Sequence, residues 1–154
     1  MKTDQLKKLR WAELIGMASI VLSVLLLALE IQQNTEVASA QALAELNAVA
    51  NDILNSEAEN DNLAAVLVKG DADLSALSDV EARQYRSHVY AMINVIDSAH
   101  GFYLRGILDE DDFTGWREYA CTFLGGSSVN SIWNTYKETF GVTFVQFVSD
   151  SCEL

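Results

Sequence analysis

The chain contains no proline, and it has few residues of the types on which catalysis and metal binding usually depend. Only two cysteines and two histidines occur among its 154 residues, and 10 Lys and Arg stand against 22 Asp and Glu. Because proline interrupts helices while Ala and Leu favour them, a proline-free chain without a long Gly/Ser linker favours an all-α fold.

Basic residues are absent between Trp11 and Val68, and from Glu36 onward the chain has 19 acidic but only 6 basic residues. A protein that binds nucleic acid needs a basic surface to neutralise phosphates, so nucleic acid is excluded as a partner. An acidic surface is also repelled by anionic lipid headgroups.

The motifs of common enzymes are also missing, since the chain has no G-x-S-x-G, P-loop or H-E-x-x-H. Asp97 and His100 are spaced like one Glu-x-x-His motif of a di-iron bundle, but such a site needs two motifs and additional carboxylates. His88 lies about three turns from His100 and could not join the pair without another chain. We therefore expect no metal, no cofactor and no enzymatic activity.

A second acidic motif, Asp71-x-Asp73-x-Ser75, is similar to the start of a calcium-binding loop. The loop would require Gly at its sixth position and an acid at its twelfth, where this chain has Ala76 and Ala82. We interpret these acids as helix caps.

The most informative feature is an apolar segment at residues 11–31, in which Ile15–Leu29 carries no charge. About 21 helical residues span roughly 31 Å, enough to cross the hydrocarbon core of a bilayer. A cleaved signal peptide is the alternative, but no small-x-small triplet follows Leu29. The sequence predicts an uncleaved transmembrane helix, so the lipid bilayer is an expected partner.

Four basic residues lie in the tip formed by residues 1–10: Lys2, Lys7, Lys8 and Arg10. The positive-inside rule then places the N-terminus in the cytoplasm and the remainder outside it. We expect a bacterial inner-membrane protein with a periplasmic C-terminal domain.

One face of the apolar segment carries mostly small residues at alternating spacings of four and three. They are Ala12, Gly16, Ser19, Ser23 and Leu26, and Glu30 continues the series. Small residues allow helix backbones to approach closely in lipid, which predicts a helix-packing face. The alternative is coincidence, since small residues are common in membrane helices.

Residues 32–56 are expected to form a helical stalk, and residues 57–154 an acidic helical domain. The stalk either continues the anchor helix or starts anew after a kink at Gln32–Asn34, with Thr35 opening the second helix. Within the domain we expect a helix from Asp61 that ends at Lys69 and Gly70.

Further helices are expected to begin at the capping box Ser78-x-x-Glu81, at Asp109–Asp112, and at Val129, the last of these ending at Gly141. A final apolar face runs from Phe144 to Val148 and is read as a helix, with a strand as the alternative.

The last third of the chain is rich in aromatic residues, which we interpret as the domain core or else as a docking surface. The residues in question include Trp116, Trp133, Phe144 and Phe147. The two cysteines, Cys121 and Cys152, form a disulfide if the domain lies in an oxidising compartment, and are otherwise unpaired thiols.

Several of these motifs together resemble an uncharacterised family of small single-pass proteobacterial membrane proteins. The resemblance lies in Trp11-x-Glu13-Leu14-Ile15-Gly16, Ile31-Gln32-Gln33-Asn34-Thr35, Leu77-Ser78 with Glu81, Gly106-Ile107-Leu108-Asp109, Trp116 and Phe144-x-x-Phe147. The chain departs from the family pattern at Glu30, at Gln32 and at Asp97–His100. The resemblance implies an architecture, and it carries no established activity.

These observations predict a membrane-anchored, non-catalytic interaction protein, an accessory or assembly subunit of a larger inner-membrane complex. Its partners would be other membrane-protein subunits or further copies of itself. The alternative is a self-associating periplasmic sensor that binds a small ligand through the aromatic cluster.

Overall fold

The structure, a computed structural model, describes the backbone of residues 2–152 and the side chains of Trp11 and residues 13–152. It is 89% helical, and no strand occurs in the part of the chain that it describes, so the expected all-α fold is confirmed. The elements are α1 (Lys2–Ala58), α2 (Asp61–Ala72), η1 (Leu74–Ala76), α3 (Asp79–Leu104), α4 (Glu110–Leu124), α5 (Ser127–Tyr136), η2 (Lys137–Thr139) and α6 (Val142–Ser151).

The chain divides into two compact units, of which the first ends at Ser39 and the second begins at Ala40. Helix α1 contributes to both units, and the division falls within the segment expected as a stalk. No helix start occurs at Gln32–Asn34, since α1 continues through these residues, and the Thr35 hydroxyl donates to the carbonyl of Ile31 at 2.9 Å instead of capping a new helix. Thr35 is therefore an interior residue of α1.

The N-terminal unit contains the apolar part of α1. From Glu13 this helix includes an 18-residue window with a mean hydropathy of 2.5, and none of that window is buried. By length and composition, α1 is long and apolar enough to cross a membrane.

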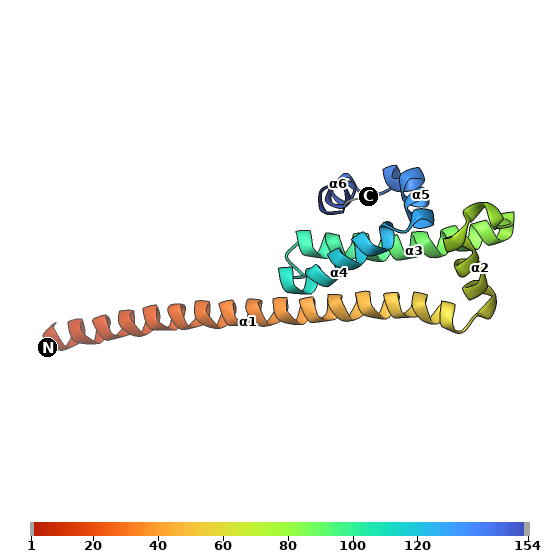
Figure 1. Ribbon diagram of the computed structural model, residues 1–154. Coiled ribbons are helices and arrows are strands. Elements are labelled where there is room, and N and C mark those ends of the chain that lie inside the picture. Colours follow the sequence, from red (N-terminus) through yellow and green to blue (C-terminus); the bar gives the residue numbers. More distant parts are fainter. Residues whose placement is uncertain (1, 153–154) are drawn as a thin grey trace. The chain divides into compact units, whose positions relative to one another are not determined.

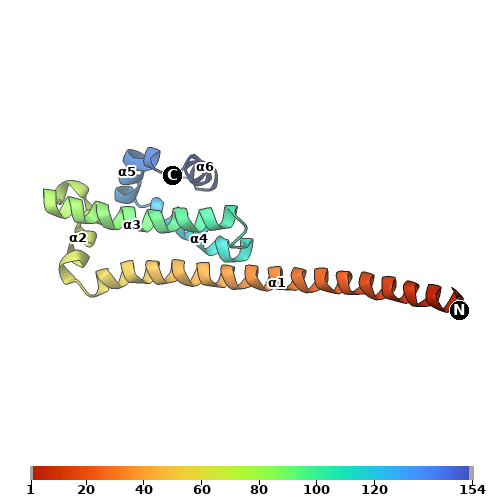
Figure 2. The same ribbon diagram turned by 180° about the vertical axis from the view of Figure 1, so that it is seen from behind.

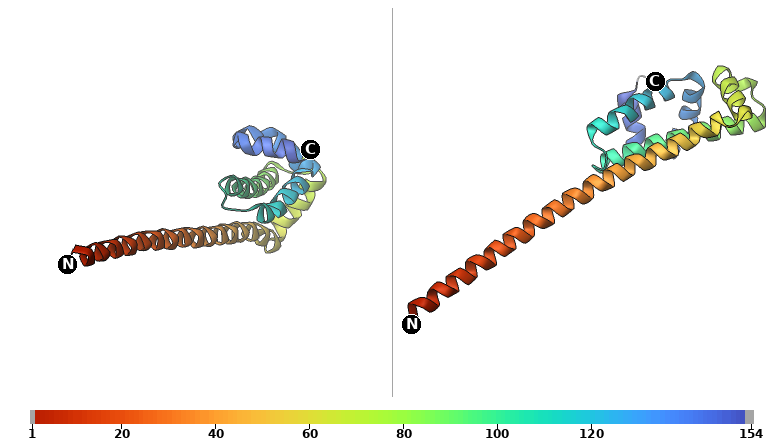
Figure 3. Two further views of the ribbon diagram at one scale, coloured as in Figure 1. Left: turned by 90° about the vertical axis from the view of Figure 1, so that its left-hand side faces the viewer. Right: turned by 90° about the horizontal axis from the view of Figure 1, so that it is seen from below.

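Helix α3 is the centre of the second unit, which we call the helical unit (Figure 1). Helix α4 lies along α3, while α5 and α6 pack on one side of this pair and α2 crosses the N-terminal end of α3. The part of α1 beyond Ala40 lies on the other side of the α3–α4 pair. The view from behind shows this (Figure 2), as do the views turned by 90° (Figure 3).

Two hydrophobic clusters fill the helical unit. The larger joins α3 to α2, α4, α5 and α6 through residues that include Tyr85, Ile93, Leu124, Trp133 and Phe144. The smaller joins α3 and α4 to α1 through Leu46, Val95, Ala99, Leu108 and Phe113. Trp116 and Phe147 pack against both clusters, so the two form one continuous core.

Local capping fixes most helix starts in this unit. Ser78 and Glu81 form the expected capping box of α3, and the Asp109 carboxylate accepts the amide of Asp112 at the start of α4. The Asn60 side chain likewise accepts the amide of Leu63 at the start of α2. Each cap satisfies a backbone N–H that has no partner within its helix.

The expected end of α2 at Lys69 and Gly70 is wrong, because the helix continues to Ala72. Gly70 is instead a packing residue, since a Cβ atom placed there would lie 2.7 Å from Cε2 of Tyr85 on α3. Beside it, the ammonium of Lys69 forms an ion pair with Glu81 at 2.9 Å, which ties α2 to the start of α3.

The C-terminal segment is helical, so the strand alternative for Phe144–Val148 is wrong. The helix expected to begin at Val129 starts at Ser127 and gives way to a 3₁₀ turn after Tyr136. Gly141 then serves as the N-cap residue of α6 rather than as the end of the preceding helix.

We expect Gly70→Ala to lower the free energy of unfolding by about 1 to 3 kcal/mol, because the added methyl group would overlap the buried ring of Tyr85. Gly115→Ala is the matched control within α4, where a Cβ meets nothing within 4 Å. That change should raise stability by roughly 0.5 to 1 kcal/mol. Chemical denaturation followed by circular dichroism measures both, and equal effects would contradict the packing role of Gly70.

Candidate functional site

The aromatic residues singled out in the sequence mainly form the core of the helical unit. Trp133 and Phe144 are buried with 3% and 0% exposure, while Trp116 and Phe147 are half-buried. The rings of Trp133 and Phe144 meet edge to face at a centroid separation of 5.7 Å. Such packing supports the interpretation of these residues as core rather than as a docking surface.

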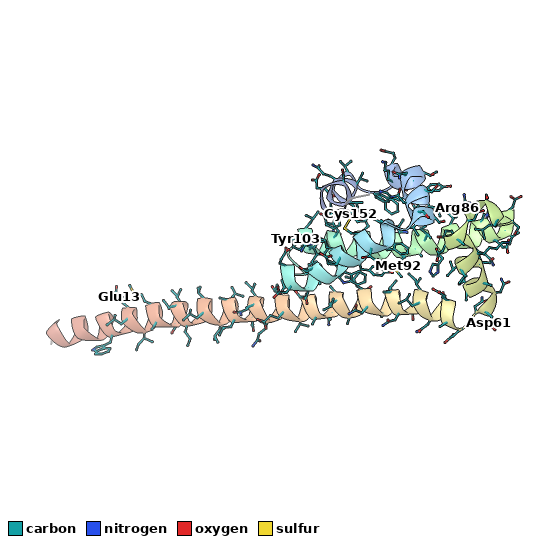
Figure 4. All side chains as sticks on the ribbon, in the orientation of Figure 1. Glu13, Asp61, Arg86, Met92, Tyr103 and Cys152 are labelled. Carbon is teal, nitrogen blue, oxygen red and sulfur yellow. A yellow bond between two sulfur atoms is a disulfide. The ribbon has the colours of Figure 1, made fainter. Side chains whose placement is uncertain are left out.

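Cys121 and Cys152 form a disulfide with an S–S distance of 1.99 Å and a Cα–Cα distance of 5.0 Å. Cys121 lies on α4, and Cys152 caps the end of α6, where it is 7% exposed (Figure 4). This is the pairing that the sequence favoured, and it links the C-terminal helix to α4.

The acids of the calcium-loop-like motif have structural partners. Asp73 caps η1 by accepting the amide and the hydroxyl of Ser75 at 2.8 and 2.7 Å. Asp71 accepts the hydroxyl of Tyr85 at 2.6 Å, and this bond together with burial raises the pKa of Tyr85. The helix-capping interpretation is confirmed for Asp73, whereas Asp71 joins α2 to α3.

His100 is a core residue, 5% exposed, and its ring stacks on Phe147 with centroids 4.6 Å apart. Burial lowers the pKa of His100 and raises that of Asp97, which lies half-buried one turn earlier on α3. The imidazole is therefore neutral near pH 7 and behaves as one more ring of the aromatic core. Among the side chains that the structure describes, those of Trp11 and residues 13–152, no three His, Cys, Asp or Glu are arranged to hold a metal ion.

The other histidine, His88, has a more open environment. Its side chain is 11% exposed, and its Nε2 atom lies 3.9 Å from Oε2 of Glu57 on α1. Burial lowers the pKa of His88, although the nearby carboxylates of Glu57 and Asp71 oppose this. At 3.9 Å the contact is too long for a hydrogen bond, so Glu57 and His88 face each other without being joined.

The anchor face lies on the N-terminal unit. Gly16, Ser19, Ser23 and Leu26 are all exposed, and the side chain of Ala12 lies outside the described residues. The hydroxyls of Ser19 and Ser23 donate to the carbonyls of Ile15 and Ser19, each at 2.8 Å. These serines therefore present satisfied, small surfaces, which suit close helix packing.

Two grooves flank α1 in the helical unit. The first, of about 480 Å³, lies between α1 and α4 above Met92 of α3, and its wall includes Leu54 and Trp116. The second, of about 460 Å³, lies between α1 and α3 and is lined by Val49, Ile53 and Phe102 among others. Figure 4 shows Met92 directed from α3 toward α1.

A smaller cavity of about 130 Å³ adjoins the first groove, with which it shares Leu54, Met92 and Tyr119. It reaches inward to His88 and Glu57. Sequence patterns did not identify this region, because the residues that line the cavity come from five helices, α1 to α5. Two of these residues stand out in the sequence, His88 as one of only two histidines and Asp71 in the calcium-loop-like motif, but no pattern links them.

Comparisons with models of protein families, with curated proteins and with solved structures found no match to this chain. The resemblance to the proteobacterial single-pass family therefore stays a prediction.

We expect the denatured, unreduced protein to present no reactive thiol. Cys152→Ser should lower the free energy of unfolding by about 3 to 4 kcal/mol, because the bridge closes a loop over a sequence separation of 31 residues. Reduction of the unaltered protein should cause a similar loss, while the neighbouring Ser151→Ala should cause almost none. Two labelled thiols per chain would contradict the disulfide.

Proposed function

We propose that this protein is a membrane-anchored, non-catalytic interaction protein that serves as an accessory or assembly subunit of a larger inner-membrane complex. The observation that carries the proposal is the exposed apolar surface of α1. Every residue from Glu13 to Ile31 is exposed, and the twelve large apolar side chains of this segment are each at least 55% exposed. Such a surface is unfavourable in water and is covered by lipid or by other membrane helices.

A role in assembly is supported by the two kinds of surface that the chain offers. The anchor face of small residues suits a partner helix in the bilayer. The helical unit has grooves between α1 and helices α3 and α4, which suit a partner outside the bilayer. Of the acids and histidines that could suggest chemistry, Asp73 and Asp109 are helix caps and His100 belongs to the core.

The alternative function, a sensor that binds a ligand through the aromatic cluster, has less support. Of the aromatic residues that it would use, Trp133 and Phe144 are buried in the core, and Trp116 lines the first groove. A ligand could reach the two buried rings only if the core opened, which costs stability.

The proposed topology places the N-terminus in the cytoplasm and the helical unit in the periplasm. The basic tip at residues 1–10 supports this orientation, as does the absence of Lys and Arg between Trp11 and Val68. The Cys121–Cys152 disulfide supports it independently, because disulfides persist in oxidising compartments.

The anchor face can be tested by co-purification in mild detergent. Gly16→Leu and Ser23→Leu should each reduce the recovery of partner subunits severalfold, because they add bulk where a partner helix would approach. A Cβ atom at Gly16 meets no other part of the described chain within 4 Å, so a loss reports on a partner.

Ala28→Leu is the matched control for the anchor face. At 100° per residue, Ala28 lies on the opposite side of α1, so the same gain in bulk should leave recovery unchanged. Equal losses at all three positions would show that the small-residue face has no special role.

The topology can be tested with C-terminal fusions. We expect a reporter that requires export, such as alkaline phosphatase, to be active, and a fluorophore that matures only in the cytoplasm to be dark. Reversing the charge of the tip by replacing Lys2, Lys7, Lys8 and Arg10 with Glu should shift both signals in the opposite direction. A dark phosphatase fusion on the unaltered chain would overturn the proposed orientation.

A further inference from the structure

The first groove and the adjoining cavity lie side by side in the helical unit and are taken together as one space. Their volumes are about 480 and 130 Å³, and Leu54, Met92 and Tyr119 line both. The groove alone is within the range of small-molecule binding sites, roughly 300 to 1,000 Å³. The space is thus large enough for a compact organic molecule whose end reaches the inner cavity.

The outer part of this space is mainly apolar and aromatic. Leu43, Leu54 and Met92 contribute aliphatic surface, and one wall is a row of rings along α4 formed by Trp116, Tyr119 and Phe123. Trp116 and Tyr119 meet edge to face at 6.5 Å, while Tyr119 stacks on Phe123 at 5.8 Å. Ring faces of this kind attract both apolar groups and organic cations.

The charged groups that line the space are almost all negative. Neither the groove nor the cavity is lined by Lys or Arg, whereas carboxylates come from three helices: Glu57, Asp71, Asp111 and Asp112. Asp71 is engaged by the Tyr85 hydroxyl. The Glu57 carboxylate is 40% exposed and, within the described residues, accepts no hydrogen bond and has only His88 opposite it at 3.9 Å. The inner end therefore lacks a cation for Glu57.

His88 completes the recognition chemistry of the inner end. Its burial keeps the imidazole neutral near pH 7, and a neutral imidazole has one nitrogen that can accept a hydrogen bond. An ammonium group between His88 and Glu57 would donate to both, and so would satisfy two groups that the protein itself leaves apart.

We propose that this space binds a small organic cation, an amine with an apolar or aromatic body. The ammonium group would lie between Glu57 and His88, and the body would lie along Leu54, Met92 and the rings of α4. Of the aromatic residues in the last third of the chain, the site uses Trp116 and Phe123 but not the buried Trp133 and Phe144, and it does not depend on the proposed role in assembly.

The test uses the full-length protein in nanodiscs of zwitterionic lipid, with isothermal titration calorimetry and empty nanodiscs as the blank. The probe is 2-phenylethylamine, which is protonated at neutral pH. Its comparison compounds are 2-phenylethanol, a neutral analogue, and 3-phenylpropionate, an anion. We expect the amine to bind at least about tenfold more tightly than the alcohol, and the anion not to bind.

Matched variants separate the site from general attraction to an acidic protein. Glu57→Gln should weaken amine binding about tenfold, whereas Asp52→Asn, which removes the same charge from an exposed position on α1, should leave it unchanged. Leu54→Trp should block the passage between groove and cavity. Val49→Trp, a change of similar size in the second groove, should not. Circular dichroism confirms that each variant is folded.

The dependence of binding on pH provides a further readout. The groups facing His88 are Glu57 on α1, Asp71 on α2, Tyr85 on α3 and Tyr119 on α4. Lowering the pH from about 7.5 to 5.5 should weaken amine binding, because a protonated His88 competes with the ligand for Glu57. His88→Gln should remove most of this dependence.

Three outcomes would overturn the proposal. Equal affinity for the amine and the alcohol would make the space a purely apolar site. Equal effects of Glu57→Gln and Asp52→Asn would reduce the binding to general electrostatic attraction. Absence of amine binding by the folded, unaltered protein would exclude the site altogether. None of these results would affect the tests of membrane anchoring, which use other residues and other readouts.

Discussion

The packing of α3 is the constraint on which the rest of the helical unit depends. This helix has 26 residues, and its buried positions belong to both hydrophobic clusters, so every other helix of the unit is held by covering part of it. Tyr85 shows this dependence most clearly. Its ring packs against Gly70 of α2, and its hydroxyl donates to the carboxylate of Asp71 on the same helix. A substitution at a buried position of α3 would therefore alter the packing of α2, α4, α5 and α6 together.

The acidic composition of the chain is compatible with this compact unit because many acids lie where negative charge is favourable. Asp109 caps α4, and three further acids occupy its first turn, close to the positive end of the helix dipole. At the start of α3 the backbone amide of Ser78 and the Lys69 ammonium lower the pKa of Glu81 to about 2. Negative charges spread evenly over the surface would repel one another. Here many of them lie at helix N-termini, where they stabilise the helix.

Features encoded by neighbouring residues could be predicted from the sequence, whereas those created by distant residues could not. The starts of α3 and α4 follow from Ser78, Glu81 and Asp109 alone, and the apolar part of α1 follows from hydropathy. The role of Gly70 is to leave room for Tyr85, which lies on another helix. The local rule that glycine ends a helix therefore misplaced the end of α2. The groove likewise requires α1, α3 and α4 to lie together, and no pattern in any one of them indicates it.

The groove exists because two helices present small residues to each other where a tightly packed core would have large ones. Ala50 of α1 and Gly115 of α4 both line it, while Leu46 on α1 is buried at 5% exposure and closes the contact nearby. Protein interiors are normally filled to crystal-like density, and an unfilled space loses the contacts that its lining could make. Larger side chains at positions 50 and 115 could make those contacts, so the present residues forgo the stability that the contacts would add, beside the carboxylates of Asp111 and Asp112 that also line the groove. The same small residues that weaken the contact between α1 and α4 thus create the space in which a ligand could replace the missing contacts.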